Sequence, residues 1–210
     1  MNRKSKLIWL ALVVAGLNGC ATMSGDECLI TDWTAIGYED GARGYTMARL
    51  GKYRKACAKH GVAPDFASYQ NGRDQGLLEY CRPSRGFTIG SNGGSYYGVC
   101  SVNLEADFLD SYNAGYHLYS LRSNVNRASS SIHAKENELH RIGDLITVKT
   151  ATLISREMTM EERALLLADL KNLSDRTGQH EVEIRNLYEI RARSQVELEH
   201  YQIVVADMGY

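Results

Sequence analysis

The sequence predicts an all-α protein: a small disulfide-stapled helical domain followed by a long antiparallel coiled-coil helical hairpin. The first observation is that apolar residues recur three and four positions apart through the C-terminal half. The second is that four cysteines follow Cys20 in the N-terminal half. The third is that residues 20–102 hold 13 of the 19 Gly, whereas residues 103–210 hold 4 Gly and neither Cys nor Pro. We therefore expect a leader over 1–19, the stapled domain over 20–102 and the hairpin over 103–210.

The leader has the pattern of a signal peptide. A positively charged start, Asn2–Lys6, precedes an apolar run of 11 residues, Leu7–Leu17, which is shorter than a membrane span needs. The run ends in Leu17-Asn18-Gly19-Cys20, which resembles the lipobox of bacterial lipoproteins. That resemblance implies that Cys20 is lipidated and becomes the mature N-terminus, and the alternative is an ordinary secretory signal with a coincidental cysteine.

The residue after Cys20 is Ala21 and not Asp, which in such lipoproteins favours sorting to the outer membrane. We expect a palmitate-bearing lipoprotein of a Gram-negative bacterium, anchored in the outer membrane by its N-terminal lipid, with its body in the periplasm. Multiple acyl chains would make that anchoring permanent, because each buried CH₂ contributes about 0.8 kcal/mol.

The other four cysteines, Cys28, Cys57, Cys81 and Cys100, predict two disulfides in the oxidising periplasm, with three possible connectivities. Zinc is the alternative use of such a set, but no Cys-x-x-Cys pair is present, so we expect no metal.

Helix signals favour one disulfide pairing. Asp32 and Thr46 are candidate N-caps of two helices, the second ending at Cys57 and Gly61. Two short helices joined by a tight turn run antiparallel, which favours Cys28–Cys57. A third helix is expected from Asp65 to Cys81, and a Cys81–Cys100 bond would then close the loop 82–99.

Three segments of the chain echo one another, each with an aromatic residue followed by Tyr-x-x-Gly: Tyr38–Gly41, Tyr69–Gly72 and Tyr112–Gly115. Glycines at helical spacing allow helix backbones to approach closely, so we expect a three-helix cluster. Asp40, Arg73 and Asp74 are charged residues that stand among these glycines. We expect them to form a salt bridge that stabilises the helix packing and not a polar ligand site.

Residues of the N-terminal half carry a family resemblance. They are Cys28, Trp33-x3-Gly-Tyr-Glu-Asp-Gly41, Cys57-Ala-Lys-His-Gly-Val62, Tyr69-x2-Gly-Arg-x2-Gly-Leu-x2-Tyr-Cys81 and the segment Gly93 to Cys100. Over about residues 26–122 the chain resembles the proteobacterial lipoproteins catalogued as domain of unknown function 2799. The resemblance implies an envelope lipoprotein and no known activity.

The glycine-rich loop 86–98 lacks the Gly-Lys-Ser/Thr ending of a phosphate-binding loop. Its aromatics Phe87, Tyr96 and Tyr97 are candidates for binding a glycan or peptide. The alternative, which we favour, is an irregular loop whose tyrosines cover the helices.

The C-terminal half carries two runs of residues in alternating steps of three and four. The first is Leu118, Leu121, Val125, Ala128, Ile132, Lys135, Leu139, Ile142, Ile146, Lys149 and Leu153, and the second is Leu166, Leu170, Leu173, Thr177, His180, Ile184, Leu187, Arg191, Ser194, Leu198, Tyr201 and Val205. Thr159 and Glu162 form a capping box that restarts the helix after a turn. The matched arms favour an intramolecular hairpin over a parallel dimer.

With the turn near residue 157, residue i faces about residue 314 − i, which places His133 near His180 and Lys135 near Gln179. We expect this neighbourhood to be a solvated or polar part of the seam, because no paired metal-binding motif is present.

The residues exclude several functions. The hairpin carries 17 acidic and 12 basic residues and the stapled domain is almost neutral, so we expect no nucleic-acid binding. No Ser-His-Asp order, activated Cys or carboxylate pair stands out, so we expect no enzyme and no cofactor. The leading hypothesis is a periplasmic scaffold, adaptor or envelope assembly factor whose hairpin binds an envelope protein; the alternative is a glycan- or peptide-binding module at the Cys81–Cys100 loop.

Overall fold

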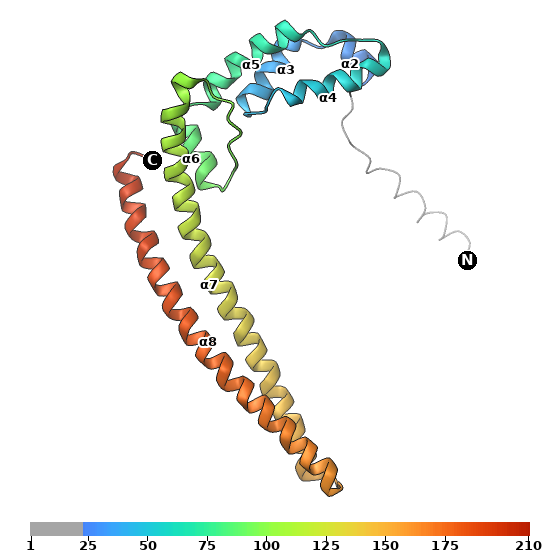
Figure 1. Cartoon of the computed structure of the whole chain (residues 1–210), viewed down its shortest axis with the longest axis vertical. Helices are drawn as coiled ribbons and strands as arrows, with labels where there is room; N and C mark the ends of the chain where they lie inside the picture. Colours follow the sequence, from blue (N-terminus) through green and yellow to red (C-terminus); the bar gives the residue numbers. More distant parts are fainter. Residues whose placement is uncertain (1–22) are drawn as a thin grey trace, which may run out of the picture. The chain divides into compact units, whose positions relative to one another are not determined.

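A computed structural model describes residues 23–210 and places them in helices joined by turns, with no strand in that range. The helices are α2 (Gly25–Ile30), α3 (Trp33–Ala42), α4 (Ala48–Cys57), the 3-10 turn η1 (Ala58–His60), α5 (Phe66–Tyr80), α6 (Pro83–Ser91), α7 (Val102–Ser155) and α8 (Met160–Asp207) (Figure 1). The all-α fold class is confirmed. The predicted signal peptide and Cys20 lie outside the described residues.

The chain forms two compact units that interleave along the sequence. Of the described residues, unit 1 contains 23–82 together with Tyr96–Glu105, and unit 2 contains Pro83–Ser95 together with Ala106–Tyr210. Each unit is described by itself below.

In unit 1, α3 and α5 cross at very close range through four glycines. A Cβ atom added at Gly37 or Gly41 of α3 would lie 2.0 or 2.2 Å from a backbone oxygen of α5, and one added at Gly72 or Gly76 would lie 1.9 or 2.1 Å from a backbone oxygen of α3. No side chain fits between the two backbones, so glycine is required on both helices.

The rest of unit 1 packs around this crossing. A core of Cys28, Trp33, Leu50, Cys57 and Tyr69 joins α2, α3, α4 and α5. Disulfides join Cys28 to Cys57 and Cys81 to Cys100, so the predicted disulfide framework is confirmed.

The helix caps agree with the sequence at two of the three expected positions. Asp32 accepts hydrogen bonds from the N–H groups of Thr34 and Ala35, and Asp65 from that of Ser68. Thr46 is not a cap: Met47 occupies the N-cap of α4, and its side chain makes no capping bond.

Unit 2 contains a second glycine crossing, between α6 and α7. A Cβ added at Gly86 or Gly90 would lie 2.5 or 2.1 Å from a backbone oxygen of α7, and one at Gly115 would lie 2.3 Å from the backbone oxygen of Phe87. The segment 82–99, expected to be an irregular loop, therefore contains a nine-residue helix. The third echo segment, Tyr112–Gly115, packs on α6, so the expected three-helix cluster is two separate helix pairs.

The two crossings repeat one another in detail. Gly44 after α3 and Gly93 after α6 both have positive φ, and a Cβ at either would meet the ring of a tyrosine, Tyr80 or Tyr119. In each helix pair, the backbone carbonyl of the residue after this glycine accepts a hydrogen bond from the second helix. The Tyr45 carbonyl accepts from the Arg73 guanidinium, and the Gly94 carbonyl accepts from the Tyr112 hydroxyl. The two helix pairs thus form an internal structural repeat, with α3–α5 as the first copy and α6–α7 as the second. Its register differs from that of the sequence echo, because Phe108 and not Tyr112 matches Tyr69.

Beyond its crossing with α6, α7 lies beside α8 (Figure 1). The positions spaced three and four apart in the sequence are shielded on both helices, from Leu118 to Leu153 and from Leu166 to Val205. Leu118, Leu121, Leu198 and Val205 form a buried cluster at one end of this pair of helices, and Phe87 packs against it. At the other end a short turn, residues 156–159, connects α7 to α8.

Candidate functional site

The buried polar centre of unit 1 is Asp40 on α3, which is 4% exposed. Tyr69 of α5 donates its hydroxyl to Asp40 Oδ2 at 2.9 Å, and Tyr53 of α4 donates to Oδ1 at 3.3 Å. Arg49 Nε lies 3.7 Å from the same Oδ1 and donates to the Tyr53 hydroxyl at 3.2 Å. The carboxylate therefore joins three helices.

Both tyrosines stay protonated at neutral pH. Burial raises the pKa of Tyr69 well above its ordinary value, and the hydrogen bond to Asp40 raises it further. Burial likewise raises the pKa of Tyr53. Both hydroxyls are therefore donors to the Asp40 carboxylate. Within the described residues no buried side-chain nitrogen or oxygen is left without a hydrogen bond, so the centre is a closed network.

The charged residues picked from the sequence pair differently from the expectation. The ion pair of Asp40 is with Arg49, while the guanidinium of Arg73 donates twice to the Tyr45 carbonyl at 3.0 and 3.1 Å. Asp74 is exposed. The missed partners Arg49 and Tyr53 stand four residues apart on α4, and that helical spacing was the available signal.

The internal repeat indicates what the Asp40 network does. In the second copy Ile89 stands at the position of Asp40, just before the matching glycine, and Phe108 takes the place of Tyr69. The second copy also has no helix in the position of α4, since residues 92–101, between α6 and α7, contain no helix. The hydrogen bonds of Asp40 therefore fasten α4 to the first crossing.

The three aromatic residues proposed as a ligand site fall in different units. Phe87, in unit 2, stacks on Tyr210 with ring centroids 4.3 Å apart. Tyr96, in unit 1, donates its hydroxyl to Glu105 and accepts from the Cys100 N–H. Tyr97, also in unit 1, is exposed. Two of the three rings thus make contacts within the chain.

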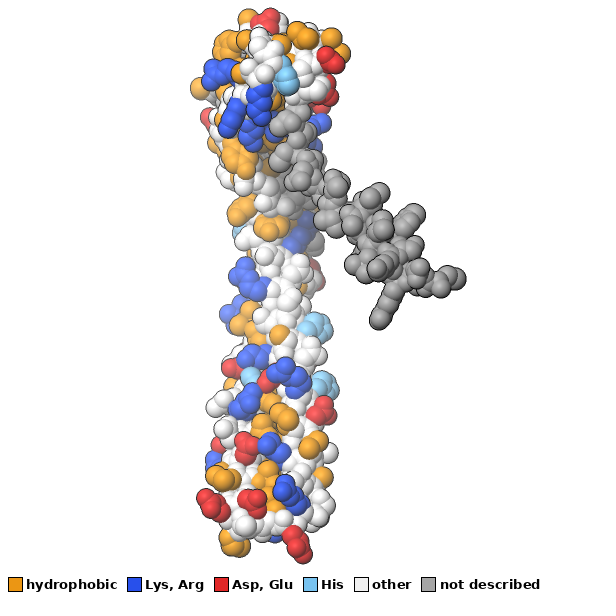
Figure 2. Space-filling model, turned by 90° about the vertical axis from the view of Figure 1, so that its right-hand side faces the viewer, with side chains coloured by type: hydrophobic (Ala, Val, Ile, Leu, Met, Phe, Trp, Pro, Cys, Tyr) orange, Lys and Arg blue, Asp and Glu red, His pale blue; other side chains and the backbone are white. Residues whose placement is uncertain are grey.

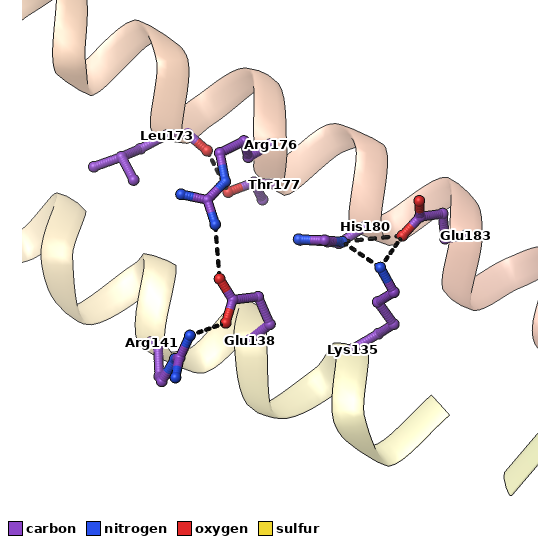
Figure 3. A network of polar contacts seen from close by, with 8 residues as sticks. All are labelled: Lys135, Glu138, Arg141, Leu173, Arg176, Thr177, His180 and Glu183. Carbon is purple, nitrogen blue, oxygen red and sulfur yellow. Dashed lines mark hydrogen bonds and ion pairs between the residues drawn. The ribbon is translucent and has the colours of Figure 1, made fainter. Parts of the chain in front are cut away.

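A polar layer interrupts the apolar contacts between α7 and α8 (Figure 3). Lys135 of α7 forms an ion pair with Glu183 of α8 at 2.7 Å and lies 3.4 Å from Nδ1 of His180. His180 is also within 3.0 Å of Glu183. The hydrogen bonds from Lys135 and then from His180 lower the pKa of Glu183.

A second interhelical ion pair joins Glu138 to Arg176 at 2.7 Å, one turn along α7 (Figure 3). The expected neighbours of this region are partly wrong, because His180 faces Lys135 and His133 is exposed beside Glu136 of its own helix. No group of three or more His, Cys, Asp or Glu side chains within residues 23–210 is arranged to hold a metal ion.

A pocket of about 670 Å³ opens beside the turn between α7 and α8. Met158, Leu165 and Leu166 supply apolar walls, and Arg156, Glu162 and Asp169 supply charged ones. Ile154 and Met160, on either side of the same turn, are 81% and 82% exposed. This end of the helix pair therefore presents large apolar side chains to solvent.

The fold and the disulfides define an all-helical, disulfide-stapled protein. Residues 32–117 match the family model described as "Protein of unknown function (DUF2799)", which confirms the resemblance over that segment. The matched segment contains both glycine crossings and ends inside α7. No curated protein and no solved structure matches the chain. None of the helices that the structure describes is both long and apolar enough to cross a membrane.

Proposed function

We propose that this chain is a non-enzymatic outer-membrane lipoprotein, anchored through Cys20, whose α7–α8 pair binds an envelope protein in the periplasm. In this proposal unit 1 follows the anchor in the sequence, and the helix pair of unit 2 carries the binding surface. The anchor is supported by the signal-peptide pattern and by Leu17-Asn18-Gly19-Cys20. The non-enzymatic role is supported by the sequence, in which no Ser-His-Asp order, activated Cys or carboxylate pair stands out.

In the same proposal α7 and α8 form an intramolecular antiparallel coiled coil. The regular shielding of positions three and four apart supports it. So do the ion pairs between the helices, since Lys149 pairs with Asp169 near the turn and Lys135 pairs with Glu183 farther away. Polar residues at seam positions weaken such a pair but fix its register.

The observation that carries the docking role is the apolar end of the pair, formed by Ile154, Met160 and Leu165 around the pocket. Contiguous exposed apolar side chains rimmed by charge mark protein interaction sites. The neighbouring Arg156, Glu162 and Asp169 would give such an interface a polar rim.

A substitution experiment tests this role. The triple variant Ile154→Ser, Met160→Ser, Leu165→Ser removes the apolar end, and Val182→Ser, Val196→Ser, Ile203→Ser is the matched control at other exposed positions of α8. We expect pull-down from solubilised envelopes to recover a discrete partner with the parent and the control but not with the first variant. Equal recovery with both variants would contradict the assignment.

A further inference from the structure

One segment of unit 1 is strongly basic although the unit as a whole is not. Residues 41–64 contain six Lys and Arg and no Asp or Glu. Lys52 and Lys55 on α4 and Lys59 in η1 follow helical spacing and are all exposed. Figure 2 shows Lys and Arg side chains gathered on the visible face of this unit. We call Lys52, Lys55 and Lys59 the basic stripe.

The structure does not use the basic stripe internally. Within the described residues, the side chains of Lys52, Lys55 and Lys59 make no hydrogen bond or ion pair, whereas Arg43 and Arg49 of the same segment pair with Glu39 and Asp40. The basic residues of α7 and α8 differ in this respect, since Lys135, Lys149 and Arg176 each form an ion pair with a carboxylate. Three unpaired like charges on one face repel one another, so this arrangement favours an external anionic partner.

Exposed apolar side chains lie at the same end of unit 1. Leu29 and Ile30 of α2 are 71% and 84% exposed. The Cys28–Cys57 disulfide ties α2 to the end of α4, next to η1. The acidic residues nearest to this apolar pair along the chain are Asp26, Glu27 and Asp32. The Glu27 carboxylate accepts a hydrogen bond from the Ser24 N–H, and Asp32 caps α3. Basic residues beside exposed aliphatic ones are typical of surfaces that lie on a bilayer.

We propose that the basic stripe, with Leu29 and Ile30, lies on the headgroups of an anionic phospholipid bilayer. This inference rests on the proposed anchor at Cys20. Because α2 begins five residues after Cys20, and five residues span at most about 17 Å, the anchor would hold α2 close to the membrane. Each basic residue close to an anionic surface strengthens binding about fivefold, so the three lysines contribute about 100-fold at low salt. The lipid fixes the protein to the membrane, and the stripe then orients unit 1 upon it.

The test uses the full chain isolated from membranes. Flotation with vesicles of phosphatidylcholine alone shows first whether the chain carries an anchor. If it floats, the acetylation rates of Lys52, Lys55 and Lys59 by a water-soluble reagent are compared on phosphatidylcholine vesicles with and without phosphatidylglycerol. We expect at least fivefold slower acetylation on the anionic vesicles at low salt, reversal at high salt, and no change at Lys171 of α8.

If the chain does not float on neutral vesicles, the proposed anchor is wrong, and the stripe is tested by its own binding. Lys52→Gln, Lys55→Gln, Lys59→Gln should then weaken flotation on anionic vesicles about 100-fold, and the control Arg163→Gln, Arg185→Gln, Arg193→Gln on α8 should not. Equal acetylation on both kinds of vesicle, or equal flotation of both variants, would overturn the proposal. So would protection by soluble heparin but not by anionic vesicles, which would assign the stripe to an anionic polymer.

Discussion

The crossing of α3 and α5 makes a quantitative prediction for Gly72→Ala. The added Cβ would lie 1.9 Å from the Thr34 backbone oxygen, whereas ordinary contacts begin at 3.4 Å, so the backbones must separate by about 1.5 Å. Overpacking of this kind costs about 3 kcal/mol at the upper end of its range, because backbone atoms cannot swing away. Alanine recovers about 1 kcal/mol of helix propensity, which leaves unit 1 destabilised by about 2 kcal/mol.

Gly51→Ala on α4 is the matched control, because a Cβ there meets nothing within 4 Å. It should stabilise the protein by up to about 1 kcal/mol through helix propensity alone. Urea unfolding followed by the fluorescence of Trp33, a buried core residue of unit 1 and the only tryptophan beyond residue 22, measures both variants. A Gly72→Ala variant that unfolds at the same urea concentration as Gly51→Ala would refute the reasoning.

Three further predictions concern polar contacts and a disulfide. Tyr69→Phe should cost about 1–3 kcal/mol in urea unfolding, because it removes a donor from the buried Asp40 carboxylate, and an unchanged midpoint would contradict that role. The lowered pKa of Glu183 means that its stabilising effect is present above the unfolded-state pKa and is lost as pH falls through the folded one. Thermal stability of the parent should therefore drop more between pH 6 and 3 than that of Glu183→Gln, and parallel pH profiles would argue against this. Replacing Cys28 and Cys57 by Ser should lower the free energy of unfolding by about 3.5 kcal/mol, because that disulfide joins residues 29 positions apart. In this variant a reductant should lower the stability further only by breaking Cys81–Cys100.

Local periodicity explains why much of the fold could be predicted. The three- and four-residue spacing marks the shielded face of α7 and α8 because a helix must turn one stripe toward its neighbour. The Thr159–Glu162 capping box also forms as the sequence indicates. Its equivalent at Ser24 and Glu27 was an available signal for α2, which is only six residues long.

The features that the sequence did not reveal depend on tertiary contact. Gly86 and Gly90 lower the helix propensity of α6, and only the close approach of α7 explains why glycine stands there. The Asp40 network was likewise hidden, because Arg49, Tyr53 and Tyr69 come from two other helices. In both cases a residue type unfavourable by local rules marks a place where helices meet.

Photo-crosslinking in intact cells tests the central claim most directly. A photoreactive residue at Met160, beside the turn of the α7–α8 pair, is compared with one at Val196, which is 65% exposed on α8. The proposed docking role predicts a discrete protein adduct at position 160 that Ile154→Ser and Leu165→Ser abolish, and no such adduct at position 196. The same adducts at both positions, or none at position 160, would contradict it.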